Sequence, residues 1–128
     1  MKNFIDPNEK SIQLKKINNN KLDFKKFLRS SNSVKWIECN NLEINIEGPI
    51  NKLIFKKCKN IKLSVDKTIS GIEINRCDNI HIYTSKNRDI NHLDIFKSSI
   101  ILDIYEEDLE LTNIIKDSKS SLVIENKN

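Results

Sequence analysis

Glycine and proline are scarce in this sequence of 128 residues, which contains two of each. Two glycines are too few for the glycine-rich loop that cradles phosphates in nucleotide-binding proteins. The sequence also lacks the GxSxG and HExxH motifs of serine hydrolases and zinc peptidases. No catalytic centre is visible, and we expect a protein that is not an enzyme and carries no cofactor.

Long apolar runs are absent as well. No stretch has the length needed to span a bilayer, and the N-terminus has no apolar signal region. The three cysteines are an odd number and form no disulfide framework, which is typical of a reducing compartment. The net charge of +4 is spread over many lysines instead of forming a dense basic block. We therefore expect a cytoplasmic protein that binds neither membranes nor nucleic acid.

The cysteines mark a repeat. Cys39, Cys58 and Cys77 are equally spaced, and each begins a segment in which apolar and polar residues alternate. Two further segments of the same kind begin at Lys97 and Lys119. Five repeats of about 20 residues, each with two short strands and no room for a helix, predict an all-β parallel β-helix. Its coils would stack about 4.8 Å apart.

An ordinary β-sandwich is the structural alternative, because it also has short alternating strands separated by frequent turns. A sandwich does not explain why the same residue type returns at the same phase of three successive repeats. The parallel β-helix is therefore the preferred interpretation, with a domain that spans residues 34–128.

In that fold the cysteines occupy one angular position on three consecutive coils. A small residue that buries readily suits an inward corner of a coil. The asparagines two residues later would stack as a ladder of side-chain amides; they are Asn41, Asn60 and Asn79. Neighbouring cysteines would lie near enough for oxidation to be conceivable, but a column of structural thiols is favoured.

Metal binding is not expected. Zinc sites ordinarily use pairs such as CxxC, whereas each coil here supplies a single cysteine. His81 has the outward parity of its strand, and His92 is expected in a turn. The acidic run at residues 106–110 is interpreted as a solvated loop and not as a carboxylate site.

Residues 1–33 are polar and show no repeat, so we expect them to form an N-terminal arm. Residues 21–29 are the best candidate for a short amphipathic helix. Its apolar side, with Leu22, Leu28 and one of the phenylalanines between them, would dock on a neighbouring surface.

Two charged turns are candidate contact surfaces. Lys86 and Arg88 project from one turn, and Lys119 stands beside two hydroxyl residues, Ser120 and Ser121. Polar turns that only keep the rims of a solenoid hydrated are an equally good interpretation.

The order of these segments is similar to that of a known family. From Trp36 to Tyr83, and more loosely to Ile124, the sequence resembles the C-terminal, actin-binding domain of cyclase-associated protein. The pieces that carry the resemblance are IEGPINKLIFKKCKNIKL, SGIEI at residues 70–74 and SKSS at residues 118–121. The resemblance implies a right-handed parallel β-helix of the type shared with tubulin-folding cofactor C, here with about five coils.

The same resemblance implies binding of monomeric actin, preferentially in the ADP form, and promotion of nucleotide exchange by linkage. It points to Lys119, Ser120 and Ser121 as actin-contacting residues, with Lys86 and Arg88 as weaker candidates. A homodimer is implied too. Because the sequence ends a few residues after the SKSS strand, the dimerising hairpin of that family is expected to be shortened or missing.

Two other functions stay open. Cofactor C-like proteins activate GTPases with an arginine finger. The matching position here is Glu73, whose carboxylate would repel a phosphate, and Arg76 differs from it in strand parity. GTPase activation is therefore disfavoured. A scaffold whose β-helix binds a partner other than actin is the third interpretation.

Overall fold

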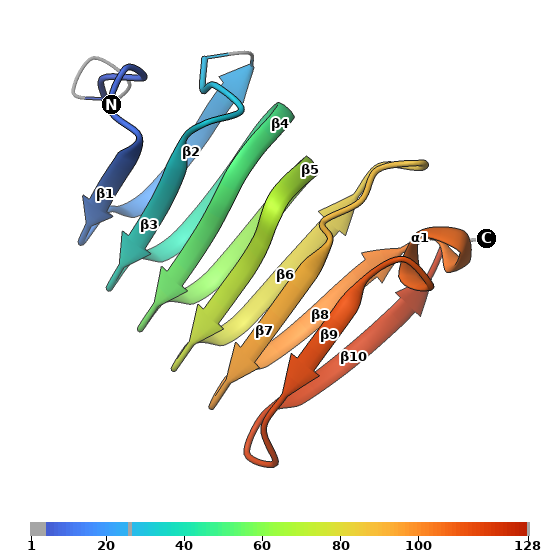
Figure 1. Cartoon of the computed structure of the whole chain (residues 1–128). Coiled ribbons are helices and arrows are strands. Elements are labelled where there is room, and N and C mark those ends of the chain that lie inside the picture. Colours follow the sequence, from blue (N-terminus) through green and yellow to red (C-terminus); the bar gives the residue numbers. More distant parts are fainter. Residues whose placement is uncertain (1–4, 26, 128) are drawn as a thin grey trace.

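The computed structural model describes residues 5–25 and 27–127 and shows a solenoid of parallel β-strands (Figure 1). Ten strands form one sheet that winds through about six turns. The elements are β1 (Ser11–Lys15), β2 (Asn18–Lys25), β3 (Ser33–Ile37), β4 (Asn40–Lys56), β5 (Lys59–Asn75), β6 (Asp78–Thr84), β7 (His92–Phe96), β8 (Ser99–Ile104), α1 (Glu106–Leu109), β9 (Asn113–Lys116) and β10 (Ser121–Asn126). The prediction of an all-β parallel solenoid is confirmed. Within the described residues, no helix is long and apolar enough to cross a membrane.

Each coil consists of two strand segments joined by corners. The first face contains β1, β3, the C-terminal parts of β4 and β5, β7 and β9. The second face contains β2, the N-terminal parts of β4 and β5, β6, β8 and β10. We call the turn from the first face to the second the first corner, and the turn back the second corner. In Figure 1 the first corners lie at the lower left ends of the strands.

The alternating residues place one side of every strand inside the coil. On the second face, Ile44, Leu63 and Ile82 come from consecutive coils and are all buried. On the first face, Trp36 stacks on Phe55 with ring centroids 4.8 Å apart. A fully buried side chain of this size contributes about 1.5–3 kcal/mol. These apolar rows therefore hold each coil to the next along the axis of the solenoid.

A column of small residues closes the first corner. Cys39, Cys58 and Cys77 are buried there, and Ser98 and Ser120 continue the column in the last two coils. The Cys58 amide donates to the Cys77 sulfur at 3.4 Å, and the Cys77 amide donates to the Ser98 hydroxyl oxygen at 3.0 Å. Buried amides need such partners. The coil that follows each of these amides therefore supplies a small side chain that accepts a hydrogen bond.

The three thiols of the column differ in pKa because each has different contacts within the column. The neighbouring Cys58 thiol and burial raise the pKa of Cys39. Cys39 lowers the pKa of Cys58 through its hydrogen bond, but contact with Cys77 and burial outweigh this and raise that pKa to about 11. The Cys58 thiol donates to Cys77 and lowers its pKa. All three thiols are free and buried, so access limits their reactivity.

The asparagines that follow the cysteines form a ladder on the outside of the solenoid. Asn41, Asn60 and Asn79 have positive φ angles of 57°, 56° and 57°. The Asn60 side-chain amide donates to the Asn41 oxygen at 3.1 Å, and the Asn79 amide donates to the Asn60 oxygen at 2.8 Å. Asn19 extends the ladder by one coil, because the Asn41 amide donates to its oxygen at 3.0 Å. Asparagine tolerates the left-handed conformation better than most residues and supplies the ladder as well.

The N-terminal segment is a coil of the solenoid, and the expectation of an arm with a helix at residues 21–29 is wrong. β1 pairs in parallel with β3, and β2 pairs in parallel with β4. Leu22 and Phe24 are buried because they alternate inward as a strand requires. The helical interpretation failed because Phe24, Phe27 and Leu28 also fit a helical spacing over so short a segment. Residues 1–4 and 26 lie outside the described residues.

The second corner is less regular, and two expectations there are corrected. The acidic run contains the short helix α1, whose Asp108 is buried and accepts a hydrogen bond from the Asn87 amide at 3.0 Å. A carboxylate that satisfies a loop amide is structural, which the sequence pattern does not reveal. His92 begins β7 instead of lying in a turn. Gly71 faces it closely, since a Cβ there would lie 2.6 Å from the His92 Cβ.

The asparagine ladder predicts an order of stability among variants at its centre. Asn60→Ala should lower the free energy of unfolding by about 1–2 kcal/mol, because it places alanine in the left-handed region and removes ladder hydrogen bonds. Asn60→Gly should cost less, since glycine tolerates the positive φ and loses only the hydrogen bonds. Urea unfolding measures both, with Lys62→Ala on the exposed side of the second face as the control. Equal stability of the alanine variant and the wild type would contradict the ladder.

Candidate functional site

The structure divides the five residues predicted to contact a partner between opposite edges of the solenoid. Lys119 and Ser121 are exposed at the first corner, where β9 passes to β10. Lys86 and Arg88 are exposed in the loop between β6 and β7, which belongs to the second corner. Ser120 is 7% exposed. A partner that docks on one edge therefore meets one of these pairs, and not Ser120.

The Ser120 side chain holds the turn between β9 and β10 together. Its hydroxyl donates to the Asp117 carboxylate and accepts the Ser98 amide at 3.0 Å. The same Asp117 carboxylate accepts the Lys97 amide at 3.1 Å. Ser120 thus joins two coils at the first corner. These hydrogen bonds fix the backbone from which its neighbours, Lys119 and Ser121, project.

Three cations surround a shallow hollow at the first corner of the last coils. Arg76, Lys97 and Lys119 line this hollow of about 340 Å³ together with Ser99 and Ser121. One carboxylate, that of Asp78, also lines it and accepts a hydrogen bond from the Ser99 hydroxyl at 2.6 Å. The three cations come from successive corners of the chain and are all exposed. We call the three cations and the two serines the basic corner. Such a concentration of positive charge on a rigid support attracts acidic groups of a partner.

An exposed aromatic ring lies beside the basic corner. Phe96 is 41% exposed. The Arg76 guanidinium lies 5.4 Å from the centre of its ring, and the Lys97 ammonium lies 5.1 Å from it. Phe96 also lines a groove of about 380 Å³ on the first face, between β5 and β9. An aromatic ring flanked by cations is the kind of anchor that dominates many protein interfaces.

The sequence did not predict three residues of this surface as site residues, namely Arg76, Lys97 and Phe96. The sequence contains a signal for one of them, because KSS occurs at Lys97 and again at Lys119. As a marker of the repeat, the KSS segment defines the phase of two coils. Because the two segments have the same phase, they also place two lysines at the same corner, one coil apart.

Glu73, the residue at the position that an arginine finger would need, lies on the first face within β5. Its carboxylate forms an ion pair of 2.6 Å with the Lys52 ammonium on the preceding coil. Arg76 lies at the corner with its guanidinium over Phe96, in another row of the solenoid. The position that an arginine finger would need therefore holds a carboxylate that is paired with a lysine, and not an arginine.

Comparison with known proteins gives one family. The model of the family described as "Adenylate cyclase associated (CAP) C terminal" matches residues 5–126. The match includes the N-terminal coil as well as the basic corner. A search of curated proteins finds no match.

Hydrogen bonds to the Asp117 carboxylate make the turn at the basic corner sensitive to acid. The Ser120 hydroxyl and the Lys97 amide lower the pKa of Asp117. A lowered pKa stabilises the fold above the unfolded value of about 3.9, and the stabilisation is lost as pH falls through the folded value. The stability difference between wild type and Asp117→Asn should therefore be constant at neutral pH and shrink below about pH 4.

Urea unfolding between neutral pH and pH 3 measures this difference, with Asp94→Asn on the first face as the control. Carboxyl NMR titration gives the same information directly. An Asp117 pKa at or above about 3.9 would show that these hydrogen bonds do not hold in solution.

Proposed function

The chain belongs to the family of C-terminal domains of adenylate cyclase-associated proteins, and we propose that it binds monomeric actin through the basic corner and Phe96. This family is the actin-binding domain of cyclase-associated protein, a binding domain and not an enzyme family. The observation that carries the proposal is that Lys119 and Ser121, the residues singled out by the SKSS segment, lie together with Arg76 and Lys97.

The chemistry of this surface suits an acidic protein partner. Three long cationic side chains can pair with carboxylates of the partner, while Phe96 supplies apolar area that is lost from water on binding. The strand backbone beneath them is fixed by pairing with neighbouring coils. A surface that is already ordered loses little entropy when it binds.

Promotion of nucleotide exchange follows from such binding without any chemistry by this chain. If the basic corner binds one conformation of actin more tightly than another, it shifts the nucleotide affinity of actin by the same factor. We therefore include exchange in the proposal, with the ADP form of actin as the preferred partner. Lys86 and Arg88 are the alternative contact, on the other edge.

Charge reversal at the two corners distinguishes these contacts. The double variant Lys97→Glu with Lys119→Glu should weaken ADP-actin binding at least about 10-fold, because it removes two attractive contacts and adds repulsion. The double variant Lys86→Glu with Arg88→Glu changes the net charge equally and should leave binding almost unchanged. Pull-down and titration with labelled ADP-actin measure the affinities, and release of a fluorescent nucleotide from actin measures exchange.

Phe96→Ala adds a test that does not depend on charge. Phe96 is exposed, so the variant should fold, and loss of an aromatic anchor should weaken binding by about 10-fold or more. Failure of the wild type to bind actin at tens of micromolar would overturn the proposal. Loss of binding in the variant at Lys86 and Arg88, but not in the variant at Lys97 and Lys119, would move the site to the second corner.

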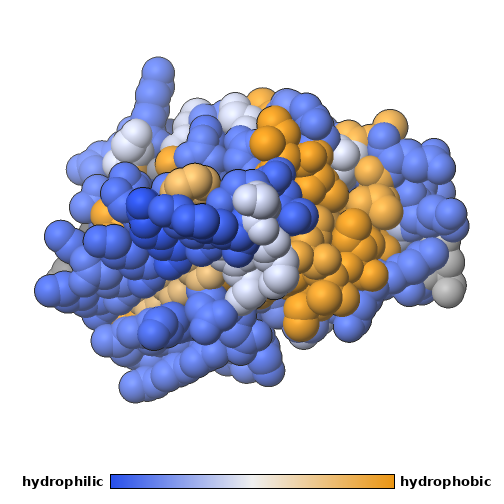
Figure 2. Space-filling model, turned by 90° about the horizontal axis from the view of Figure 1, so that it is seen from below, coloured by the Kyte–Doolittle hydropathy of each residue, from blue (hydrophilic) through white to orange (hydrophobic). Residues whose placement is uncertain are grey.

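We further propose that the C-terminal coil associates with a second copy of the chain. Ile115, Val123 and Ile124 of this coil are 59%, 53% and 41% exposed. Ile124 has the inward parity of its row, since it pairs with the buried Leu102, yet its side chain is exposed. Figure 2 shows an apolar area framed by hydrophilic residues on the side of the molecule seen from below.

Sedimentation equilibrium tests self-association in the absence of actin. Val123→Lys with Ile124→Lys should give a monomer at concentrations where the wild type is dimeric, since charged residues cannot be buried unpaired. A wild type that remains monomeric at high micromolar concentration would contradict this part of the proposal and leave the actin site unaffected.

A further inference from the structure

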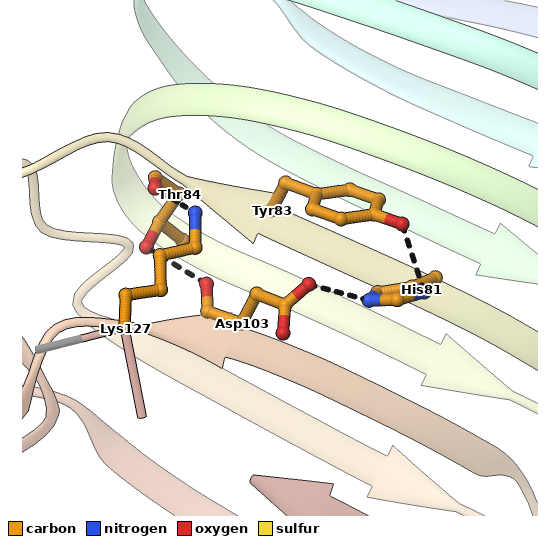
Figure 3. A network of polar contacts seen from close by, with 5 residues as sticks. All are labelled: His81, Tyr83, Thr84, Asp103 and Lys127. Atoms are coloured by element: carbon orange, nitrogen blue, oxygen red, sulfur yellow. Dashed lines mark hydrogen bonds and ion pairs between the residues drawn. The ribbon is translucent and has the colours of Figure 1, made fainter. Parts of the chain in front are cut away.

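Three side chains that can bind a metal ion converge on the second face, away from the basic corner. His81 lies on β6, Asp103 on β8 and Glu125 on β10. Their nearest ligand atoms all lie within 4.8 Å of one another. Figure 3 shows His81 and Asp103 of this group with the neighbouring Tyr83, Thr84 and Lys127. Each ligand thus comes from a different coil, and strand pairing fixes their relative positions.

The imidazole of His81 is oriented by a second contact. The Tyr83 hydroxyl lies 3.0 Å from His81 Nδ1, and the two rings stack with centroids 4.0 Å apart. Nε2 therefore points to the carboxylates and lies 2.6 Å from Asp103 Oδ2 (Figure 3). Histidines that bind metals usually have their other ring nitrogen held by a hydrogen bond in this way.

Asp103 and Glu125 lie side by side on paired strands, and Lys127 follows two residues after Glu125. The Lys127 ammonium donates to the Thr84 carbonyl at 2.8 Å and lies 5.9 Å from the centre of the Tyr83 ring (Figure 3). Two carboxylates held side by side repel each other, and a cation between them relieves this repulsion.

We propose that His81, Asp103 and Glu125 bind a divalent transition metal, with Zn²⁺ as the preferred ion. Zinc takes both imidazole nitrogen and carboxylate oxygen as ligands, and water completes a four-coordinate site with three protein ligands. Calcium prefers six to eight oxygen ligands, and a set of three with one nitrogen suits it poorly. The ligands join the last three coils of the second face, so the ion also stabilises the C-terminal end of the solenoid.

This site could not be inferred from the cysteine repeat. The cysteines point inward at the first corner, and in the sequence His81 is a single outward residue with no other metal ligand at its phase. His81 and Asp103 are 22 residues apart, and only the stacking of the coils brings them together. In the strand register, His81 pairs with Ile101, and Asp103 pairs with Tyr83, two residues further along.

Calorimetric titration of the whole chain with zinc sulfate, in a buffer without chelating components, tests the proposal. We expect one Zn²⁺ per chain, and the ion should raise the unfolding temperature. Glu125→Gln, which changes an exposed side chain, and His81→Asn should each weaken zinc binding at least about 10-fold. Glu43→Gln on the second face and His92→Asn on the first face are the matched controls and should bind as the wild type does.

Titration with Co²⁺ identifies the ligands independently of stability. The proposal predicts visible ligand-field bands without the ultraviolet charge-transfer band of a cobalt–thiolate bond. Tyr83→Phe should weaken binding less than loss of a ligand does, because it removes only the contact that orients the imidazole. The proposal is overturned if zinc does not bind, if binding survives both ligand variants, or if a thiolate band places the ion on the cysteines.

Discussion

Each coil of this protein places its residues next to those of the preceding coil, because parallel strands pair at a spacing of about 4.8 Å. A buried amide at the first corner therefore finds its partner in the next coil. The Cys58 amide uses the Cys77 sulfur, and the Ser98 amide uses the Ser120 hydroxyl. Cysteine and serine replace one another in this column because both are small and accept a hydrogen bond.

The same stacking determines what the surface can do. A residue type that recurs at one phase of the repeat becomes a row of like side chains on the outside of the solenoid. Lys97 and Lys119 form part of such a row, and Arg76 extends it by one coil. At the phase of Asn60 the row is a ladder of amides. The basic corner thus results from the repeat together with the residue types at its outward positions.

Sequence periodicity predicted the solenoid and the inward positions because alternation and a fixed spacing follow directly from the stacking of coils. It missed the first coil, in which Ile17 stands where the later coils have cysteine or serine. Sequence periodicity also does not predict contacts between side chains of different rows. Ser120 looked like a surface hydroxyl until the structure placed it in the buried column, and Phe96 gained significance only from the cations beside its ring.

Footprinting of lysines in the complex with ADP-actin tests the central claim most directly. An amine-reactive label followed by mass spectrometry gives the rate of modification at each lysine with and without actin. The account predicts that actin slows modification of Lys97 and Lys119 and leaves Lys86 and Lys62 unchanged. Slower modification of Lys86, with Lys97 and Lys119 unaffected, would contradict it.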